Sequence, residues 1–249
     1  MPPLQPSIAS LRHDPGDGDS LAIYWRFYWA VAAAQLARWL PNRPALLLDL
    51  SGLRAQCACQ AARAGHTVVS VLPRLPEEPL PRGVHAVVGD GSSLDFVASG
   101  SVDAVIAEDR VLSRYLVTEG LVAEIARVLR PGGRVLLCVD SLMLGMAILA
   151  EQNYWAHLSD VPSAEVVLVP WPDGMITRCF WSEQLRELLT DVGLEVEWIR
   201  PRTVLSPSTV EHILASDPQA LTKLVRSELS GPAPDESMGI HLVASARRL

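Results

Sequence analysis

Acidic side chains close several short apolar runs of this sequence. Asp49, Asp90 and Asp140 each end such a run, and Glu108 and Asp109 together end another. A short continuous apolar run is typical of a strand buried on both faces of a parallel sheet. The carboxyl ends of parallel strands meet at one edge, where the ligands of open α/β sheets bind. We therefore expect a ligand site at this edge, where Glu108 or Asp109 acts as a base or binds a cationic substrate group.

Histidine offers a second kind of chemistry. His157 follows Tyr154 and Trp155 in a segment after the last of these runs, and it is a candidate general base because imidazole titrates near neutral pH. A surface histidine is the plainer interpretation. The six histidines and four cysteines show no metal-ligand spacing, so the sequence predicts no metal site. The motifs GxSxG, GxxxxGK[ST] and HExxH are absent, which leaves hydrolase, nucleotidase and metalloprotease functions without support.

Five strand-like runs alternate with helix-like or irregular segments in the first 140 residues. Strands that alternate with helices predict an α/β fold with a doubly wound parallel sheet. The segment 72–83 contains four prolines, so one crossover should be an extended loop and not a helix. The expected strands are residues 45–50, 67–72, 84–90, 102–108 and 134–140.

Residues 20–40 should form an N-terminal helix with an aromatic stripe, either packed in the core, at a homodimer face or as a lid over a pocket. The polar residues 1–19 predict a flexible tail before one domain that spans residues 20–249. After residue 141 the pattern changes, and an inserted helix and hairpin are expected over 141–181. The elements predicted there and beyond are a helix at 142–158, a hairpin at 165–170 and 175–180, a helix from Ser182, a strand at 194–200, helices capped by Ser206 and Asp217, and a strand at 240–246.

Composition and charge narrow the class further. The chain has 249 residues, 49% of them hydrophobic, which excludes wholesale disorder. Its net charge of −7 disfavours a nucleic-acid partner, and no apolar run approaches the roughly 20 residues of a spanning helix. Without a signal-like N-terminus or a disulfide pattern, we expect a cytoplasmic protein with no membrane partner.

Five segments in order resemble one known family. The run EIARVLRPGGRVLLCVD at residues 124–140 is similar to the helix-to-strand signature of class I, Rossmann-like methyltransferases that depend on S-adenosylmethionine (SAM). Before it, the runs VVGDGSSLDF and SVDAVIAEDRVL resemble the family's third-strand and fourth-strand motifs. After it, FWSEQLRELLTDVGLEVEWI resembles the late helix and sixth strand, and MGIHLVASARR resembles the closing antiparallel strand. The resemblance implies a seven-stranded sheet whose last strand is antiparallel, with the inserted hairpin as a lid.

The resemblance also implies where SAM would bind. Asp49 would contact its amino group, Asp90 and Gly91 its adenine, and the end of the fourth strand would face the transferred methyl group. The implied cofactor-binding residues are Asp49, Ser51, Gly52, Leu72, Asp90, Gly91 and Glu108, and the catalytic candidates are Asp109 and His157.

Two motifs depart from the family pattern, namely the loop after the first strand and the end of the second strand. Ser51, Leu53 and Ala55 stand where glycines are expected, and Leu53 is the bulky one. Leu72 stands where a carboxylate would hold the ribose hydroxyls. If the site is only eroded, Leu72→Asp should raise the affinity for SAM.

The sequence therefore favours a SAM-dependent methyltransferase that acts on a small molecule. The main alternative is a protein with the methyltransferase fold whose SAM site has decayed, leaving a binding or regulatory function. A third interpretation is an enzyme of this fold with chemistry other than methyl transfer. A nicotinamide-dependent oxidoreductase is disfavoured because the GxGxxG loop is absent.

Overall fold

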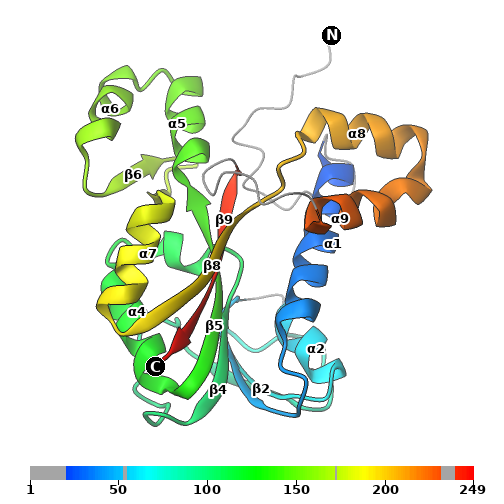
Figure 1. Cartoon of the computed structure of the whole chain (residues 1–249), viewed down its shortest axis with the longest axis vertical. Coiled ribbons are helices and arrows are strands. Elements are labelled where there is room, and N and C mark those ends of the chain that lie inside the picture. The colour runs from blue at the N-terminus through cyan, green and yellow to red at the C-terminus, as the bar shows by residue number, and fades with distance from the viewer. Residues whose placement is uncertain (1–20, 53–54, 172, 231–238) are drawn as a thin grey trace.

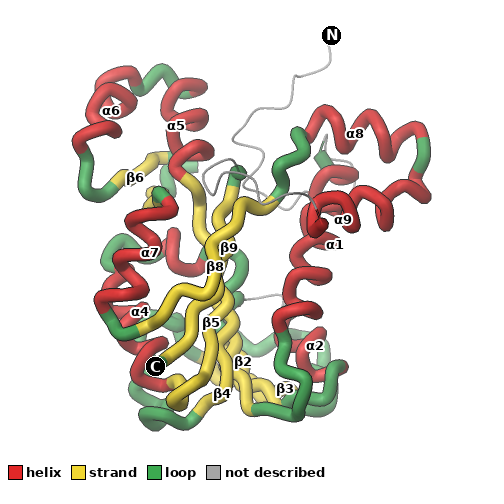
Figure 2. The backbone as a smooth tube through the Cα atoms, viewed as in Figure 1, coloured by secondary structure: helices red, strands yellow, loops and turns green. Residues whose placement is uncertain are grey.

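The protein is a mixed sheet with helices on both faces (Figures 1 and 2). The computed structural model describes residues 21–52, 55–171, 173–230 and 239–249, so the expected tail and Leu53 lie outside the described residues. The strands are β1 (Leu46–Asp49), β2 (Thr67–Leu72), β3 (Val84–Val88), β4 (Val102–Ala107), β5 (Leu129–Ser141), β6 (Val167–Pro170), β7 (Ile176–Phe180), β8 (Leu194–Arg202) and β9 (His241–Arg248).

The seven strands that the resemblance implies form one sheet. Its order is β3-β2-β1-β4-β5, continued by β9 and β8. The strands β1 to β5 run parallel, and β9 lies antiparallel to both β5 and β8. This arrangement confirms the doubly wound α/β sheet with an antiparallel last strand.

Two helical layers cover the sheet. On one face lie α1 (Ala22–Trp39) and α2 (Gln56–Arg63), and on the other lie α4 (Thr118–Val128) and α7 (Ser182–Asp191) (Figure 1). Buried aliphatic side chains of β1, β4 and β5 fill both interfaces, as expected for strands without a solvent face. As predicted, the proline-rich segment between β2 and β3 contains no helix.

The expected aromatic helix is confirmed as α1. It packs against α8 (Pro207–Ser216) and α9 (Leu221–Ser230), and Tyr24, Trp25, Phe27 and Tyr28 are buried in that contact. Ser206 caps α8 by accepting a hydrogen bond from the Thr209 amide, and Asp217 caps the short turn η3 (Pro218–Ala220).

The inserted segment differs from its prediction in two ways. The helix expected over 142–158 is broken into α5 (Leu142–Glu151) and α6 (Trp155–Asp160), because Asn153 takes a left-handed conformation with φ of 60°. The hairpin of β6 and β7 is not a detached lid, since β7 pairs in parallel with the end of β5 and extends the sheet. With this hairpin the sheet has nine strands, which include the seven that the resemblance implies.

The remaining elements are short, namely α3 (Val111–Arg114) after β4 and the turn η2 (Val161–Ser163) after α6. Among the described residues, none of the helices combines the length and the apolar character needed to cross a membrane.

Candidate functional site

A cavity of about 490 Å³ opens at the carboxyl ends of the parallel strands, and we call it the edge pocket. Its wall comes from α1, from the segments that follow β1, β3 and β4, and from the end of β2. Six of the nine predicted site residues line it, namely Ser51, Gly52, Asp90, Gly91, Glu108 and Asp109. Its volume falls within the range typical of small-molecule sites, about 300–1,000 Å³.

Asp49 does not line the edge pocket but supports its first loop. Its carboxylate accepts a hydrogen bond from the Ser51 amide at 3.0 Å and another from the Ser70 hydroxyl at 3.2 Å. Asp49 is completely buried, and burial raises the pKa of its carboxyl group above the usual value. The residue therefore fixes the turn after β1, and a hydrogen bond from the Ala58 amide also joins it to the first turn of α2.

The turn after β1 is joined to the end of β4. The Ser51 hydroxyl accepts a hydrogen bond from the Glu108 amide at 3.2 Å. Gly52 has a φ of 101°, a conformation that other residues rarely adopt. The one glycine of this loop therefore stands at the position where the backbone conformation requires a glycine. A Cβ atom there would meet only the Arg114 guanidinium at 3.8 Å, which leaves the loop open toward the pocket.

Glu108 is held by a cation of the chain itself. Arg202 donates to its two carboxylate oxygens at 2.7 and 2.8 Å, and Gln35 accepts a third bond from Arg202 at 2.7 Å. The side chains of Glu108 and Arg202 are 2% and 0% exposed, so this is a buried, bidentate ion pair. Both carboxylate oxygens are already engaged, and Glu108 is therefore a poor candidate for a base or for a substrate cation.

Asp109 and Arg110 have an unusual backbone. Both are left-handed, with φ of 57° and 56°, and they begin one residue after the end of β4. Two successive non-glycine residues in this region carry strain, which is typical of functional sites. The Asp109 carboxylate lies 3.5 Å from the Arg110 guanidinium and 3.3 Å from that of Arg114. Asp109 is thus the carboxylate of this strand end that remains partly exposed to the pocket.

Asp90 forms the opposite wall of the edge pocket. One of its oxygens accepts hydrogen bonds from the amide and the hydroxyl of Ser92, at 2.8 and 2.7 Å. These bonds lower the pKa of Asp90, so the carboxylate is ionised at neutral pH. Its backbone carbonyl accepts from the Tyr115 hydroxyl. The other carboxylate oxygen has no protein donor among the described residues and can accept from a ligand.

Leu72 lies outside the edge pocket. It is completely buried and packs on the α2 side of the sheet, in contact with the same apolar cluster as Ala58 and Ala61. Val71 and Pro73 line the pocket instead, because side chains alternate between the two faces of a strand. A carboxylate that reaches the pocket from this strand end would therefore come from position 73.

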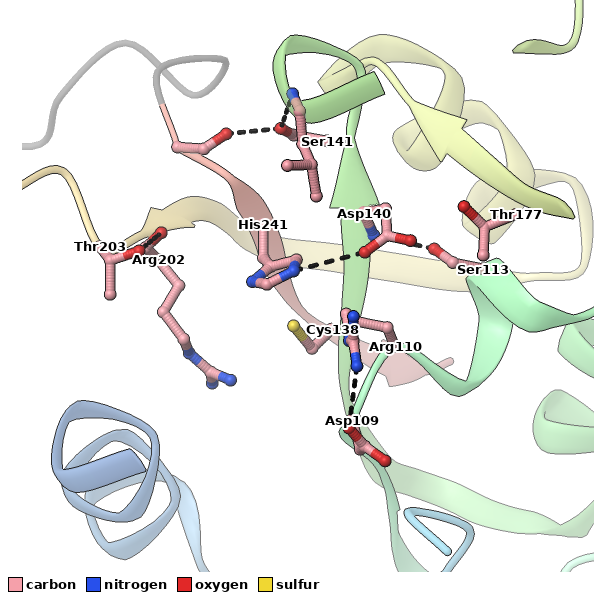
Figure 3. Close-up of polar contacts among 12 residues, drawn as sticks. Asp109, Arg110, Ser113, Cys138, Asp140, Ser141, Thr177, Arg202, Thr203 and His241 are labelled. Atoms are coloured by element: carbon pink, nitrogen blue, oxygen red, sulfur yellow. Dashed lines mark hydrogen bonds and ion pairs between the residues drawn. The ribbon is translucent and has the colours of Figure 1, made fainter. Parts of the chain in front are cut away.

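A second cluster of buried ionisable groups lies at the end of β5 (Figure 3). His241 Nε2 is 3.3 Å from an oxygen of Asp140, which pairs with it across β5 and β9, and the Asp140 amide donates to the Ser113 hydroxyl. Burial opposes ionisation of Asp140, but contact with His241 and the charge of Arg110 outweigh it and lower the pKa of this carboxyl. Burial lowers the pKa of His241, which is therefore neutral at pH 7.

His157 is separated from these groups. It lies on α6, in the upper left of Figure 1, where it is exposed and its ring centroid is 5.6 Å from that of Tyr154. It does not line the edge pocket.

Sequence reasoning did not single out four residues that shape these sites, namely Arg110, Tyr115, Arg202 and His241. Arg110 carried a signal, because it directly follows two acidic residues at a strand end. Arg202 is 94 residues from Glu108, and no local pattern connects them.

A comparison with known protein families finds a match to the part of the chain that forms most of the edge pocket. Residues 48–137, which run from β1 into β5, match a family model described as a methyltransferase domain. With the fold, this match confirms the resemblance to the class I, Rossmann-like SAM-dependent methyltransferases. A search of curated proteins by sequence found no match.

Solved structures share the fold at low identity. One is a 1,6-didemethyltoxoflavin-N1-methyltransferase from Burkholderia thailandensis with bound S-adenosylhomocysteine (20% identity, TM-score 0.58, 90% of this chain and 80% of that chain). Another is an S-adenosylmethionine dependent methyltransferase from Mesorhizobium loti (15% identity, TM-score 0.57, 89% of this chain and 100% of that chain). A third is the [4+2]-cyclase SpnF (20% identity, TM-score 0.55, 90% and 80%).

Proposed function

We propose that this chain is a SAM-dependent methyltransferase that binds SAM in the edge pocket and methylates a small molecule. The observation that carries the proposal is the convergence of Ser51, Gly52, Asp90, Gly91 and Asp109 on one cavity of about 490 Å³. All residues that line this cavity, apart from Trp29, belong to the segment that matches the methyltransferase domain. A ligand at the carboxyl edge of an open α/β sheet is also the general expectation for this architecture.

The walls of the edge pocket suit an adenosyl group. Leu50, Val71 and Val111 supply apolar surface, and the free oxygen of Asp90 supplies an acceptor for an adenine amino group. Gly52 and Gly91 both have positive φ and let the backbone approach a ligand closely.

The ribose has no carboxylate at the end of β2. Within the described part of the chain, that strand offers Leu72, which is buried, and Pro73, which cannot accept through its side chain. Gln56 and Asp109 both line the pocket, and each has a side-chain oxygen that can accept a hydrogen bond from a ribose hydroxyl. We propose that they and solvent replace the missing carboxylate.

The proposed chemistry needs few catalytic groups. When bound, SAM supplies an electrophilic methyl group, and transfer requires chiefly that the acceptor be held in line with it. Asp109 is placed to orient a cationic acceptor or to take its proton, because it lines the pocket and Arg114 fixes it at 3.3 Å. His157 stays a second proposal for a base.

A small-molecule substrate is supported by the methyltransferase from Burkholderia thailandensis, whose structure holds 1,6-didemethyltoxoflavin. The net charge of −7 argues in the same direction, against a nucleic-acid substrate. A cytoplasmic location and a homodimer stay predictions. The alternative of a protein with a decayed SAM site is not favoured by the match to a methyltransferase domain.

The test is transfer of a labelled methyl group from SAM to a mixture of cell metabolites, with label counted separately in small molecules and in macromolecules. We expect label in the small-molecule fraction with the wild-type chain, and a loss of at least tenfold with Asp109→Asn. Label in macromolecules would overturn the substrate class. Binding of SAM without any transfer would favour chemistry other than methylation, for which the cyclase SpnF is a structural precedent.

A further inference from the structure

A second cavity lies away from the edge pocket, between α1, β8 and α9, and we call it the rear cleft. Its volume is about 270 Å³. Gln35, Arg38 and Trp39 of α1 form one wall, and Arg134 of β5 with Trp198 and Arg200 of β8 form another. The rear cleft shares no lining residue with the edge pocket.

The rear cleft is positively charged in a chain that is acidic overall. Arg38, Arg134 and Arg200 line it, whereas Glu228 is its one acidic lining residue within the described ranges. These four side chains give a formal charge of +2, against a net charge of −7 for the chain. The three arginines come from three different elements, so they are brought together by the fold and are not neighbours in the sequence.

Two of the arginines are stacked on indole rings. The guanidinium carbon of Arg134 lies 5.4 Å from the centre of the Trp39 ring, and that of Arg200 lies 5.3 Å from the centre of the Trp198 ring. The Trp39 indole is itself fixed by a hydrogen bond of 2.9 Å to the Ser245 hydroxyl. Stacking holds a guanidinium plane in place and leaves its N–H edge able to donate.

Within the described ranges, Arg38 and Arg200 form no ion pair. Neither guanidinium lies within 4.0 Å of a carboxylate among the described residues, although Arg134 pairs with Glu197 at 2.7 Å. Arg38 donates to the Leu229 carbonyl at 3.3 Å, which holds it against α9. The oxygen of Gln35 is occupied by Arg202, so its amino group is a further donor.

We propose that the rear cleft binds a compact dianion, either a phosphate monoester or a small dicarboxylate. Arg38 and Arg200 supply two guanidiniums for the oxygens of such a ligand, and arginine binds carboxylate and phosphate oxygens in a bidentate manner. The cavity is smaller than the roughly 300–1,000 Å³ of sites for drug-sized ligands, which selects a compact ligand. This site does not depend on SAM binding.

The experiment is calorimetric titration of the full chain with inorganic phosphate and, separately, with succinate, at constant ionic strength set by sodium chloride. We expect saturable binding with one site per chain for at least one of the two ions. Tighter binding of phosphate would identify a phosphate monoester as the ligand class, and tighter binding of succinate a dicarboxylate. The titration contains no SAM, so its result is separate from the test of methyl transfer.

The matched variants are Arg38→Gln with Arg200→Gln, and Arg63→Gln as the control. All three arginines are exposed, and Arg63 lies on α2 without lining the rear cleft. We expect the double variant to bind at least tenfold more weakly and the control to stay within twofold of wild type. Arg200→Lys, which keeps the charge but not the fork of donors, should give an intermediate loss. Absence of saturable binding to the wild-type chain, or equal binding by the double variant, would overturn the proposal.

Discussion

Arg202, the last residue of β8, donates a bidentate pair of hydrogen bonds to Glu108, which directly follows β4, at 2.7 and 2.8 Å. Both side chains are almost completely removed from solvent. The pair ties the late antiparallel part of the sheet to the carboxyl edge of its parallel part. It also neutralises one of two adjacent carboxylates that line the edge pocket and leaves Asp109 as the partly exposed one.

Breaking this pair should strongly destabilise the protein. Arg202→Met leaves the Glu108 carboxylate buried without a partner, and we expect the free energy of unfolding in urea to fall by about 3–5 kcal/mol. The double variant Glu108→Gln with Arg202→Met removes the charge as well and should recover part of the loss.

Arg247→Met is the control for that comparison. Its ion pair with Glu195 is exposed to solvent, so we expect a much smaller loss of stability than for Arg202→Met. Equal losses for Arg202→Met and Arg247→Met would contradict a stabilising role of the buried pair.

Acid should destabilise the protein through His241. Burial lowers its pKa in the folded state, so the unfolded chain, with a usual histidine pKa of about 6.5, binds more protons as the pH falls. The free energy of unfolding should therefore decrease between pH 7 and pH 5, by up to about 1.4 kcal/mol per pH unit from this group. Asp140 acts in the same direction at lower pH, because its pKa is also lowered.

His241→Gln should flatten this pH dependence, which urea unfolding at a series of pH values would measure. The residual slope belongs in part to His66, whose pKa burial also lowers. His85→Gln, on the exposed side of β3, should leave the slope unchanged. An identical slope in His241→Gln and wild type would rule out His241 as its source.

Position 73, and not position 72, should control the affinity for an adenosyl ligand at the end of β2. Pro73→Asp places a carboxylate in the edge pocket, and we expect it to tighten S-adenosylhomocysteine binding by about tenfold, the value of a charged hydrogen bond. Pro73→Asn separates the effect of the charge from that of losing proline. Calorimetric titration with S-adenosylhomocysteine measures the affinity of the wild-type chain and of both variants.

From the sequence we expect Leu72→Asp to raise the affinity for SAM, but from the structure we expect it to destabilise the protein. Leu72 is completely buried among apolar side chains, so an aspartate there would be an unpaired buried charge and should destabilise the fold by several kcal/mol. Tighter ligand binding by a stably folded Leu72→Asp variant would show that position 72 does reach the ligand.

The sheet could be predicted because its signal is local. Each parallel strand is a short apolar run, and acidic residues mark the edge where the runs end. Side chains alternate between the two faces of a strand, and Val71 and Pro73 lie on the face of β2 that lines the pocket. The position of Leu72 on the opposite, buried face could therefore have been predicted from the sequence.

The rest depended on contacts between distant segments. The partner of Glu108 lies 94 residues away, and the addition of β7 to the end of β5 rests on two residue pairs of Asp140 and Ser141 with Cys179 and Phe180. Aspartate adopts a left-handed backbone more often than most residues do, but arginine seldom does, so the conformation of Arg110 could not be predicted from its residue type.

The central claim is that the edge pocket binds the adenosyl group of SAM, and calorimetric titration with S-adenosylhomocysteine tests it most directly. We expect one site per chain with micromolar affinity, about −8 kcal/mol. Asp90→Asn keeps the turn with Ser92 but loses an acceptor for adenine, and it should bind at least tenfold more weakly, whereas Asp95→Asn, in the same exposed loop, should bind as wild type does. No binding by the wild-type chain at millimolar ligand, or equal binding by Asp90→Asn, would contradict the account.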